Sequence, residues 1–339
     1  MEENYPRNHP YKTFEEQLAL LEERNLIIDD VELALESIKT FSYYTIVNGY
    51  KDLFIIPGIK NTFIKGTTFS MLYQMHWIDL SISSILFKYT LAVEKKIKTQ
   101  VANLVAKYFT IEEEQYLNRK NYAQAKHNRG KMTYLRKAIE VAKKRDHSAR
   151  HYFAKEKNLP PWIAAKAISF GEIVNWYSML QDVHKQEIIK SFLGDNCVLS
   201  ENERLVFFKK ALNQVYEYRN LSAHGNRNFK LQLPQDVKYT WKHLRVLGID
   251  NFFEENGKPA NQNNFYSVIL SILLLTNDVY VCGNLIIEIK NFIEAYNRPS
   301  FLFHGKNIFQ LLNFPKDIED RLDKFFTAKF PQSDINQAN

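Results

Sequence analysis

The chain has 339 residues, of which 45% are hydrophobic and 24% charged, a balance that excludes an intrinsically disordered protein. Its 11 glycines and 10 prolines are few for this length, so we expect few turns and long regular elements, for which helices are the natural candidate. The only cysteines, Cys197 and Cys282, exclude a disulfide scaffold and fit no CxxC metal spacing, which favours a reducing compartment.

Apolar residues recur every three or four positions along most of the chain, the period of amphipathic helices. In chain order, this pattern predicts helices over residues 14–24, 30–41, 71–86, 90–109, 134–145, 163–179, from 203 to a stop near Gly225, 265–296 and 318–326. Loops are predicted at 56–58, 159–161, 225–234 and 251–262, and a small hairpin over 55–63 is compatible with the pattern. Because no alternation is long enough for a sheet, the sequence predicts an all-α protein.

The organisation and location of the chain follow from its apolar and polar stretches. Residues 1–10 lack the apolar centre of a signal peptide, and the most apolar stretch, 268–289, is interrupted by Asn277, Asp278, Asn284 and Glu288. We therefore expect a buried helix there rather than a membrane span, and a cytoplasmic protein. No composition break marks a linker, so the expected organisation is an N-terminal docking region (1–70), one helical domain (71–330) and a disordered tail (331–339).

Positive charge is concentrated in one segment, residues 119–157. It holds 13 Lys and Arg against three acidic residues, a net +10, whereas the whole chain carries only +7. Such a block favours a polyanionic partner such as RNA, with aromatic residues Tyr122, Tyr134, Tyr152 and Phe153 available to stack on bases. The alternative is a solvated basic face without a partner. The candidate RNA-binding residues are Lys126, Arg129, Lys131, Arg136, Lys137, Lys143, Lys144, Arg145, Arg150 and His151.

A second candidate site lies at the C-terminal end of the helix that is predicted to begin near residue 203. Arg219 is followed by Asn220 and, five positions after the arginine, by His224. Spacing alone is weak evidence, and the alternative for His224 is a structural histidine near a helix end. Arginine is a fixed cation suited to phosphate, and histidine can act as base or acid near neutral pH. Together they suit RNA cleavage by the adjacent 2′-OH, which needs a base, an acid and a cation but no metal or cofactor, and no metal-binding motif is found.

The helical period also bears on how these two residues could act together. Residues five apart point about 140° apart on an ideal helix, so Arg219 and His224 would not face one point. Either the helix breaks between them, or two copies of the chain build one site across a two-fold axis. We favour the homodimer.

Arg219-Asn220-(x3)-His224 resembles the signature of the HEPN ribonuclease superfamily, and the surrounding residues 11–228 resemble its abortive-infection AbiD/AbiF-like family. The shared motifs are KTFEEQL (Lys12–Leu18), LIIDD (Leu26–Asp30), Tyr43-Tyr44, Gly49-Tyr50, His151-Tyr152, LPPW (Leu159–Trp162) and SFG (Ser169–Gly171). The resemblance implies a HEPN-type helical bundle with additional N- and C-terminal helices. It also implies a metal-independent, homodimeric endoribonuclease of phage defence or a toxin–antitoxin system, with Arg219, Asn220 and His224 catalytic and a small structured RNA as partner.

Two departures from that family and one open assignment accompany the resemblance. The family commonly carries an acidic residue where this chain has Lys166, and an arginine soon after the position of Asp79, where this chain has Leu80 and Ser81. Glu94 falls where such proteins tend to carry a glutamate, and it either orients the arginine or is a surface charge. Alternative functions are structured-RNA binding without cleavage, and nucleotide binding or modification by a partner transferase.

Overall fold

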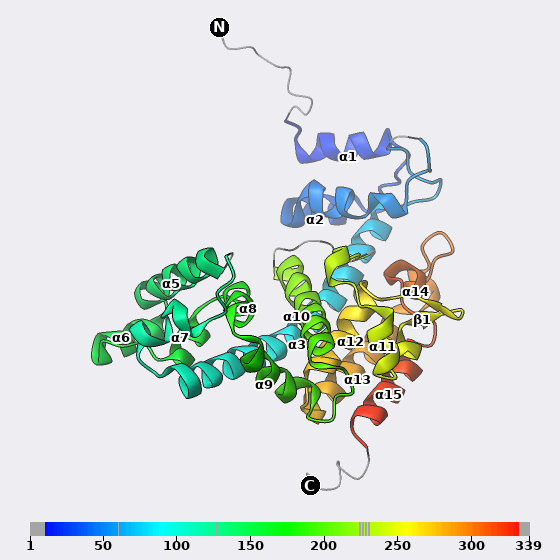
Figure 1. The fold of residues 1–339 in the computed structure, drawn as a ribbon. Helices are drawn as coiled ribbons and strands as arrows, with labels where there is room; N and C mark the ends of the chain where they lie inside the picture. Colours follow the sequence, from blue (N-terminus) through cyan, green and yellow to red (C-terminus); the bar gives the residue numbers. More distant parts are fainter. Residues whose placement is uncertain are drawn as a thin grey trace. The chain divides into compact units, whose positions relative to one another are not determined.

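The computed structural model describes residues 11–331 except residues 60, 127, 224, 226, 228 and 230. Within this part of the chain the fold consists of α-helices, short 3-10 and π turns, and one pair of two-residue strands (Figure 1). The predicted all-α class is therefore confirmed. None of the described helices combines the length and the apolar composition needed to cross a bilayer.

The chain forms two compact units. The first holds the described residues up to Ser83 together with Phe292–Leu311, and the second holds Ser84–Asn291 and the described residues from Leu312 onward. The boundaries fall inside helices rather than at linkers, the first of them within α3 (Phe69–Phe109). Residues 332–339 of the expected tail lie outside the described residues.

In the first unit, the first two helices begin at side chains that cap their N-termini. Its elements are α1 (Phe14–Glu22), α2 (Val31–Tyr43), a π turn (Tyr44–Asn48), 3-10 turns (Lys51–Leu53 and Pro299–Phe301), the first part of α3, and the adjoining parts of α13 (Val279–Tyr296) and α14 (Ile308–Leu312). Thr13 and Glu16 form a reciprocal capping box that begins α1, and Asp30 caps α2 through Leu33 N at 2.9 Å. α1 and α2 pack side by side (Figure 1).

The second unit holds most of the helices. They are the rest of α3, α4 (Glu113–Tyr116), α5 (Asn128–Arg145), α6 (His147–Glu156), α7 (Pro161–Ala167), α8 (Phe170–Met179), α9 (Asp182–Leu193), α10 (Glu201–Ala223), α11 (Trp241–Val246), α12 (Phe265–Leu275), the first part of α13, and α15 (Ile318–Lys329). The 3-10 turns are Arg119–Asn121, Gln235–Val237 and Asp250–Phe253, and the strands are β1 (Glu254–Glu255) and β2 (Lys258–Pro259), an antiparallel pair. α10 packs along α12, whereas α5, α6 and α7 form a cluster (Figure 1).

Several predicted helix boundaries are wrong, for local reasons. The predicted helix 163–179 is two helices, because Ser169 and Glu172 form a capping box that begins α8. The predicted helix 265–296 also breaks, where the Asp278 carboxylate accepts hydrogen bonds from Tyr280 N and Val281 N at the start of α13. Conversely, 71–86 and 90–109 belong to the single helix α3, and the expected hairpin at 55–63 is only one bridge between Ile55 and Phe63.

The apolar stretch predicted as one buried helix, 268–289, is divided between α12 and α13, and its first part lies in the core. Ten of the 11 residues of α12 are buried, including both serines, Ser267 and Ser271. The second unit is thus centred on a helix that is apolar nearly all round, and α10 is one of the helices that cover it.

Candidate functional site

A buried polar network fixes α10 against α12. The Gln214 side chain is fully buried, and its Nε2 donates to Val237 O and Gln262 O at 3.0 and 2.9 Å. Its Oε1 accepts from the Ser267 hydroxyl at 2.7 Å and the Ser271 hydroxyl at 3.3 Å. Because all these groups are satisfied in the core, the network fixes the rotation of α10 about its axis. That rotation decides where Arg219, five residues later, points.

Arg219 lies one turn before the end of α10, next to α3. Its Nε is 3.3 Å from Glu94 Oε2, an ion pair without hydrogen-bond alignment, and its side chain is 26% exposed. The Nη groups of Arg219 make no hydrogen bond to another described residue. One side of the guanidinium is therefore held by a carboxylate, and the other is available to a ligand.

Glu94 is the centre of this arrangement. It is 7% exposed, and its other oxygen, Oε1, lies 3.0 Å from Nζ of Lys98, one turn further along α3. Lys98 also donates to the carbonyl of Ile168, at the C-terminal end of α7, at 2.7 Å. Of the two alternatives for Glu94, a surface charge does not agree with its burial, whereas contact with Arg219 is what an orienting role requires.

The remaining residues of the predicted signature lie at the end of α10. α10 stops at Ala223, and Gly225 adopts a left-handed conformation with φ of +65°, in agreement with the predicted helix stop. Asn220 is half-buried, and its side chain makes no hydrogen bond to another described residue. The Ser222 hydroxyl is buried without a partner among the described residues. His224, the predicted base or acid, lies outside the described residues.

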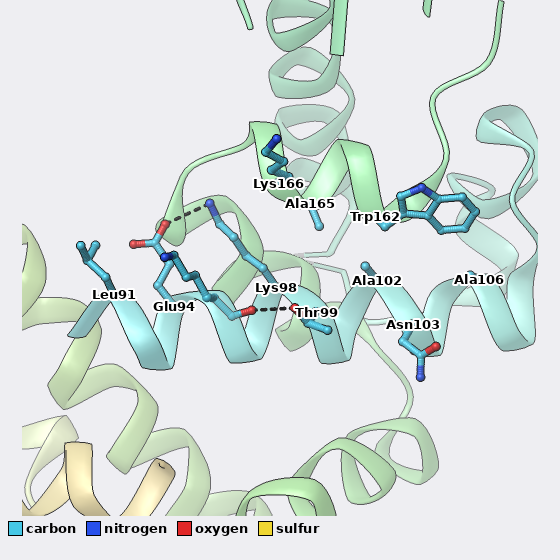
Figure 2. A pocket seen from close by; sticks show the side chains of 11 residues that line it. Leu91, Glu94, Lys98, Thr99, Ala102, Asn103, Ala106, Trp162, Ala165 and Lys166 are labelled. Atoms are coloured by element: carbon cyan, nitrogen blue, oxygen red, sulfur yellow. Dashed lines mark hydrogen bonds and ion pairs between the residues drawn. The ribbon is translucent and has the colours of Figure 1, made fainter. Parts of the chain in front are cut away.

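A groove runs along α3 from Leu91 past Glu94 to Ala106 (Figure 2). It has a volume of about 640 Å³ and lies between one face of α3 and the short helix α7. Glu94, Lys98 and Ala102 come from α3, and Trp162 and Lys166 from α7. We refer to it as the α3/α7 groove. Sequence reasoning did not predict it, because its two sides are 60 to 70 residues apart.

The basic segment 119–157 is mostly helical and mostly exposed. Lys126, Arg129, Lys137, Lys144, Arg145, Arg150 and His151 are all exposed. Two adjoining hollows of about 820 and 580 Å³ share Tyr134 and Lys137 on α5. We call Lys126, Arg129, Tyr134, Lys137 and Arg145, which line these hollows, the basic α5 face.

Three of the candidate RNA-binding residues are engaged within the protein. Lys143 pairs with Glu113 at 2.6 Å and Glu140 at 2.7 Å, and only 10% of its side chain is exposed. Lys131 donates to the Ser178 hydroxyl at 2.7 Å, and Arg136 to Leu117 O at 2.7 Å. Fewer positive charges of the segment 119–157 are therefore available to a ligand than its number of lysines and arginines indicates.

One aromatic residue of the segment cannot stack on RNA. Tyr122 is 1% exposed, its hydroxyl donates to Tyr116 O, and it accepts from Trp176 Nε1 at 2.9 Å. It is a core residue, and the expectation that it contacts bases was wrong. Tyr134 is 71% exposed, whereas Tyr152 and Phe153 are half-buried.

The two departures noted in the sequence fall in different surroundings. Lys166 is exposed at the α3/α7 groove, where its Nζ lies 3.2 Å from the Ser148 hydroxyl. Asp79 is buried in the first unit and accepts a hydrogen bond from the Tyr50 hydroxyl at 3.0 Å, while Ser81 bonds to the Tyr296 hydroxyl. At the second departure Ser81 is half-buried, whereas Leu80 is 39% exposed.

Sequence reasoning missed Lys98 as a partner of Glu94, although the signal was present. A glutamate four positions before a lysine is the favourable orientation for a helical ion pair. Elsewhere in the described residues, no three His, Cys, Asp or Glu side chains gather as a metal site would require.

Comparison with known proteins gives one match, to a family model. No curated protein and no solved structure matches the chain. The family model described as Abi-like protein matches residues 36–230, more than half of the chain. The match includes Glu94, the α3/α7 groove, the basic α5 face and Arg219. The chain therefore belongs to the Abi-like protein family, a family of abortive-infection proteins.

Proposed function

We propose that the protein is a HEPN-type endoribonuclease that acts in abortive infection or a toxin–antitoxin system and cleaves RNA without a metal ion. The observation that carries the proposal is the half-buried Arg219, held by buried Glu94 with its Nη groups available, at the position of the Arg-Asn-x3-His pattern. Family membership supports the biological setting, and the geometry supports a bound phosphate.

The proposed reaction uses the substrate's own nucleophile. A base removes the proton of the 2′-OH, the 2′-oxygen attacks the adjacent phosphorus, and the bond to the 5′-oxygen breaks as an acid protonates it. The products are a 2′,3′-cyclic phosphate and a 5′-hydroxyl end. Arg219 stabilises charge on the phosphoryl oxygens, His224 supplies the base or acid, and Asn220 positions the phosphate or the imidazole.

The proposed site is shared by two copies of the chain. A single copy supplies one imidazole, whereas the reaction uses both a base and an acid. A two-fold axis near the end of α10 would bring two Arg219 and two His224 side chains to one phosphodiester.

The test is cleavage of a single-stranded RNA by the purified protein in the presence of EDTA. Wild type should produce 2′,3′-cyclic phosphate ends, whereas Arg219→Ala and His224→Ala should lose cleavage and remain folded by circular dichroism. Arg298→Ala is the matched control, since Arg298 precedes His304 at a similar spacing but is exposed in the first unit. Full cleavage by either site variant, or by the protein on a strand with 2′-O-methyl groups, would exclude this mechanism.

A second candidate function, structured-RNA binding without cleavage, is favoured by the basic α5 face. Lysine and arginine side chains would contact phosphates, and Tyr134 an unpaired base. The same face would bind a regulatory RNA if the protein is a nuclease.

Sequencing the RNA that co-purifies with the protein tests whether the basic α5 face binds RNA in either case. The double variant Lys137→Glu/Arg145→Glu reverses two charges on this face. The control Lys39→Glu/Lys324→Glu reverses two charges elsewhere on the surface. Only the first pair should release the RNA; equal retention in both would rule out this face.

A further inference from the structure

The α3/α7 groove has the composition of a site for an unpaired nucleotide. Its floor contains the small side chains of Ala102 and Ala165, which are 2% and 1% exposed. Trp162 stands on one wall and is 47% exposed, with its indole over the stretch of α3 between Ala102 and Ala106 (Figure 2). A large aromatic surface above a floor of methyl groups leaves room for a planar ring, and the volume of about 640 Å³ is typical of sites for small ligands.

The charges that line the groove select an anionic occupant. Lys95, Lys98 and Lys166 line it against a single carboxylate, that of Glu94. Glu94 is already compensated by Lys98 and by Arg219, so the exposed Lys95 and Lys166 are in excess. An exposed aromatic ring combined with excess ammonium groups is the combination that binds single-stranded nucleic acid, in which the base stacks and the phosphates meet the cations.

The groove also leads to the proposed catalytic residues. Ala102 and Ala106 lie eight and 12 residues after Glu94, which at 1.5 Å per residue places Trp162 about 12–18 Å along α3 from the Glu94–Arg219 pair. At about 3.4 Å per nucleotide in a stacked strand, this distance corresponds to roughly four or five nucleotides, and to fewer in an extended strand.

We propose that Trp162 stacks on an unpaired base of the RNA substrate a few nucleotides from the scissile phosphate, and that Lys166 binds the adjoining backbone. This inference rests on the proposed ribonuclease function, since it names the substrate class of the same site as single-stranded RNA. Bases within a duplex are stacked on their neighbours and cannot reach the indole. The groove would therefore direct cleavage to a fixed distance from a loop or an unpaired end.

Binding can be measured without cleavage, with a fluorescein-labelled 12-nucleotide RNA carrying 2′-O-methyl groups, alone and annealed to its complement. Wild type should bind the single strand more tightly than the duplex. Trp162→Ala should weaken single-strand binding roughly 5- to 150-fold, the range for one lost base stack, and Trp162→Phe should restore most of it. Lys166→Ala should reduce the salt dependence of binding. Trp77→Ala is the matched control, because Trp77 is 41% exposed on the same helix but outside the groove.

The outcomes separate this inference from the proposed function. Binding that depends on Trp162 in a protein that cuts no RNA would support the groove and reject the nuclease. Cleavage by Trp162→Ala with unchanged KM and unchanged cut sites would reject the groove and keep the nuclease. A Trp162→Ala variant that binds RNA normally but changes oligomeric state would also overturn the inference, since it would show that a second copy of the chain occupies the groove.

Discussion

Glu94 and its partner Lys98 together connect the helices α3, α10 and α7. Glu94 lies between the Arg219 guanidinium of α10 and the Lys98 ammonium of its own helix, and Lys98 in turn holds the end of α7. Two cations against one buried anion give a local net charge of +1, which favours a phosphate close to Arg219. At the scale of residues, the site thus depends on a side chain that does not itself need to contact RNA.

We predict that Glu94→Gln lowers both activity and stability. An amide leaves the two cations without their anion, so Arg219 loses its fixed position and cleavage should fall about 10- to 100-fold in kcat/KM. The free energy of unfolding should fall by about 1–3 kcal/mol, measured by urea denaturation. Glu36→Gln, which breaks the exposed pair with Lys39, should change neither quantity measurably. Unchanged cleavage by Glu94→Gln would contradict the orienting role.

At the scale of elements, the C-terminal end of α12 is capped by two lysines from distant helices. Lys329 of α15 donates to the carbonyls of Leu273, Leu274 and Thr276, and Lys96 of α3 donates to that of Leu275 at 3.2 Å. Positive charge at this end of a helix is favourable. Burial nevertheless lowers the pKa of each lysine to about 8, because water is excluded from the ammonium groups.

Because the pKa values of Lys96 and Lys329 are lowered, we predict that the free energy of unfolding rises with pH. Between pH 8 and about 10.5 the folded chain has released protons that the unfolded chain still binds, so the free energy of unfolding increases. From pH 8 to 9.5, wild type should gain about 1–2 kcal/mol relative to Lys329→Met, since one group contributes at most about 1.4 kcal/mol per pH unit. Urea denaturation of both proteins at several pH values measures this, and parallel pH profiles would show that Lys329 keeps an ordinary pKa.

At the scale of the whole molecule, the proposed shared site makes a prediction about mixed dimers. The reaction uses an imidazole from each copy as base and acid, so a dimer of one wild-type and one His224→Ala subunit keeps only one of the two. Mixed dimers isolated after co-expression with two different tags should therefore lose most of the cleavage activity. Light scattering gives the oligomeric state. A monomeric protein with full activity, or mixed dimers with half or more of the wild-type activity, would count against the shared site, and a wild-type dimer carrying the same two tags is the control.

The fold class and most of the long helices could be predicted from the amino-acid order, which also singled out the two candidate regions. Helical periodicity and capping residues are local signals, so α1, α2 and the end of α10 at Gly225 lie where they were predicted. The predicted helix boundaries were wrong where one capping residue starts a new helix within a continuous apolar stretch, as at Ser169 and Asp278. The motif around Arg219 was visible because its residues lie within six positions of one another.

Which charges are available, and what lies beside Arg219, depend on contacts between segments that are distant in the sequence. Tyr122 and Lys143 look like surface residues in a basic segment, yet the first packs in the core and the second pairs with Glu113, 30 residues away. The α3/α7 groove joins Glu94 to Trp162 across a similar gap in the sequence. Periodicity specifies which side of a helix is buried but not which helix covers it, because that depends on packing between residues distant in the chain.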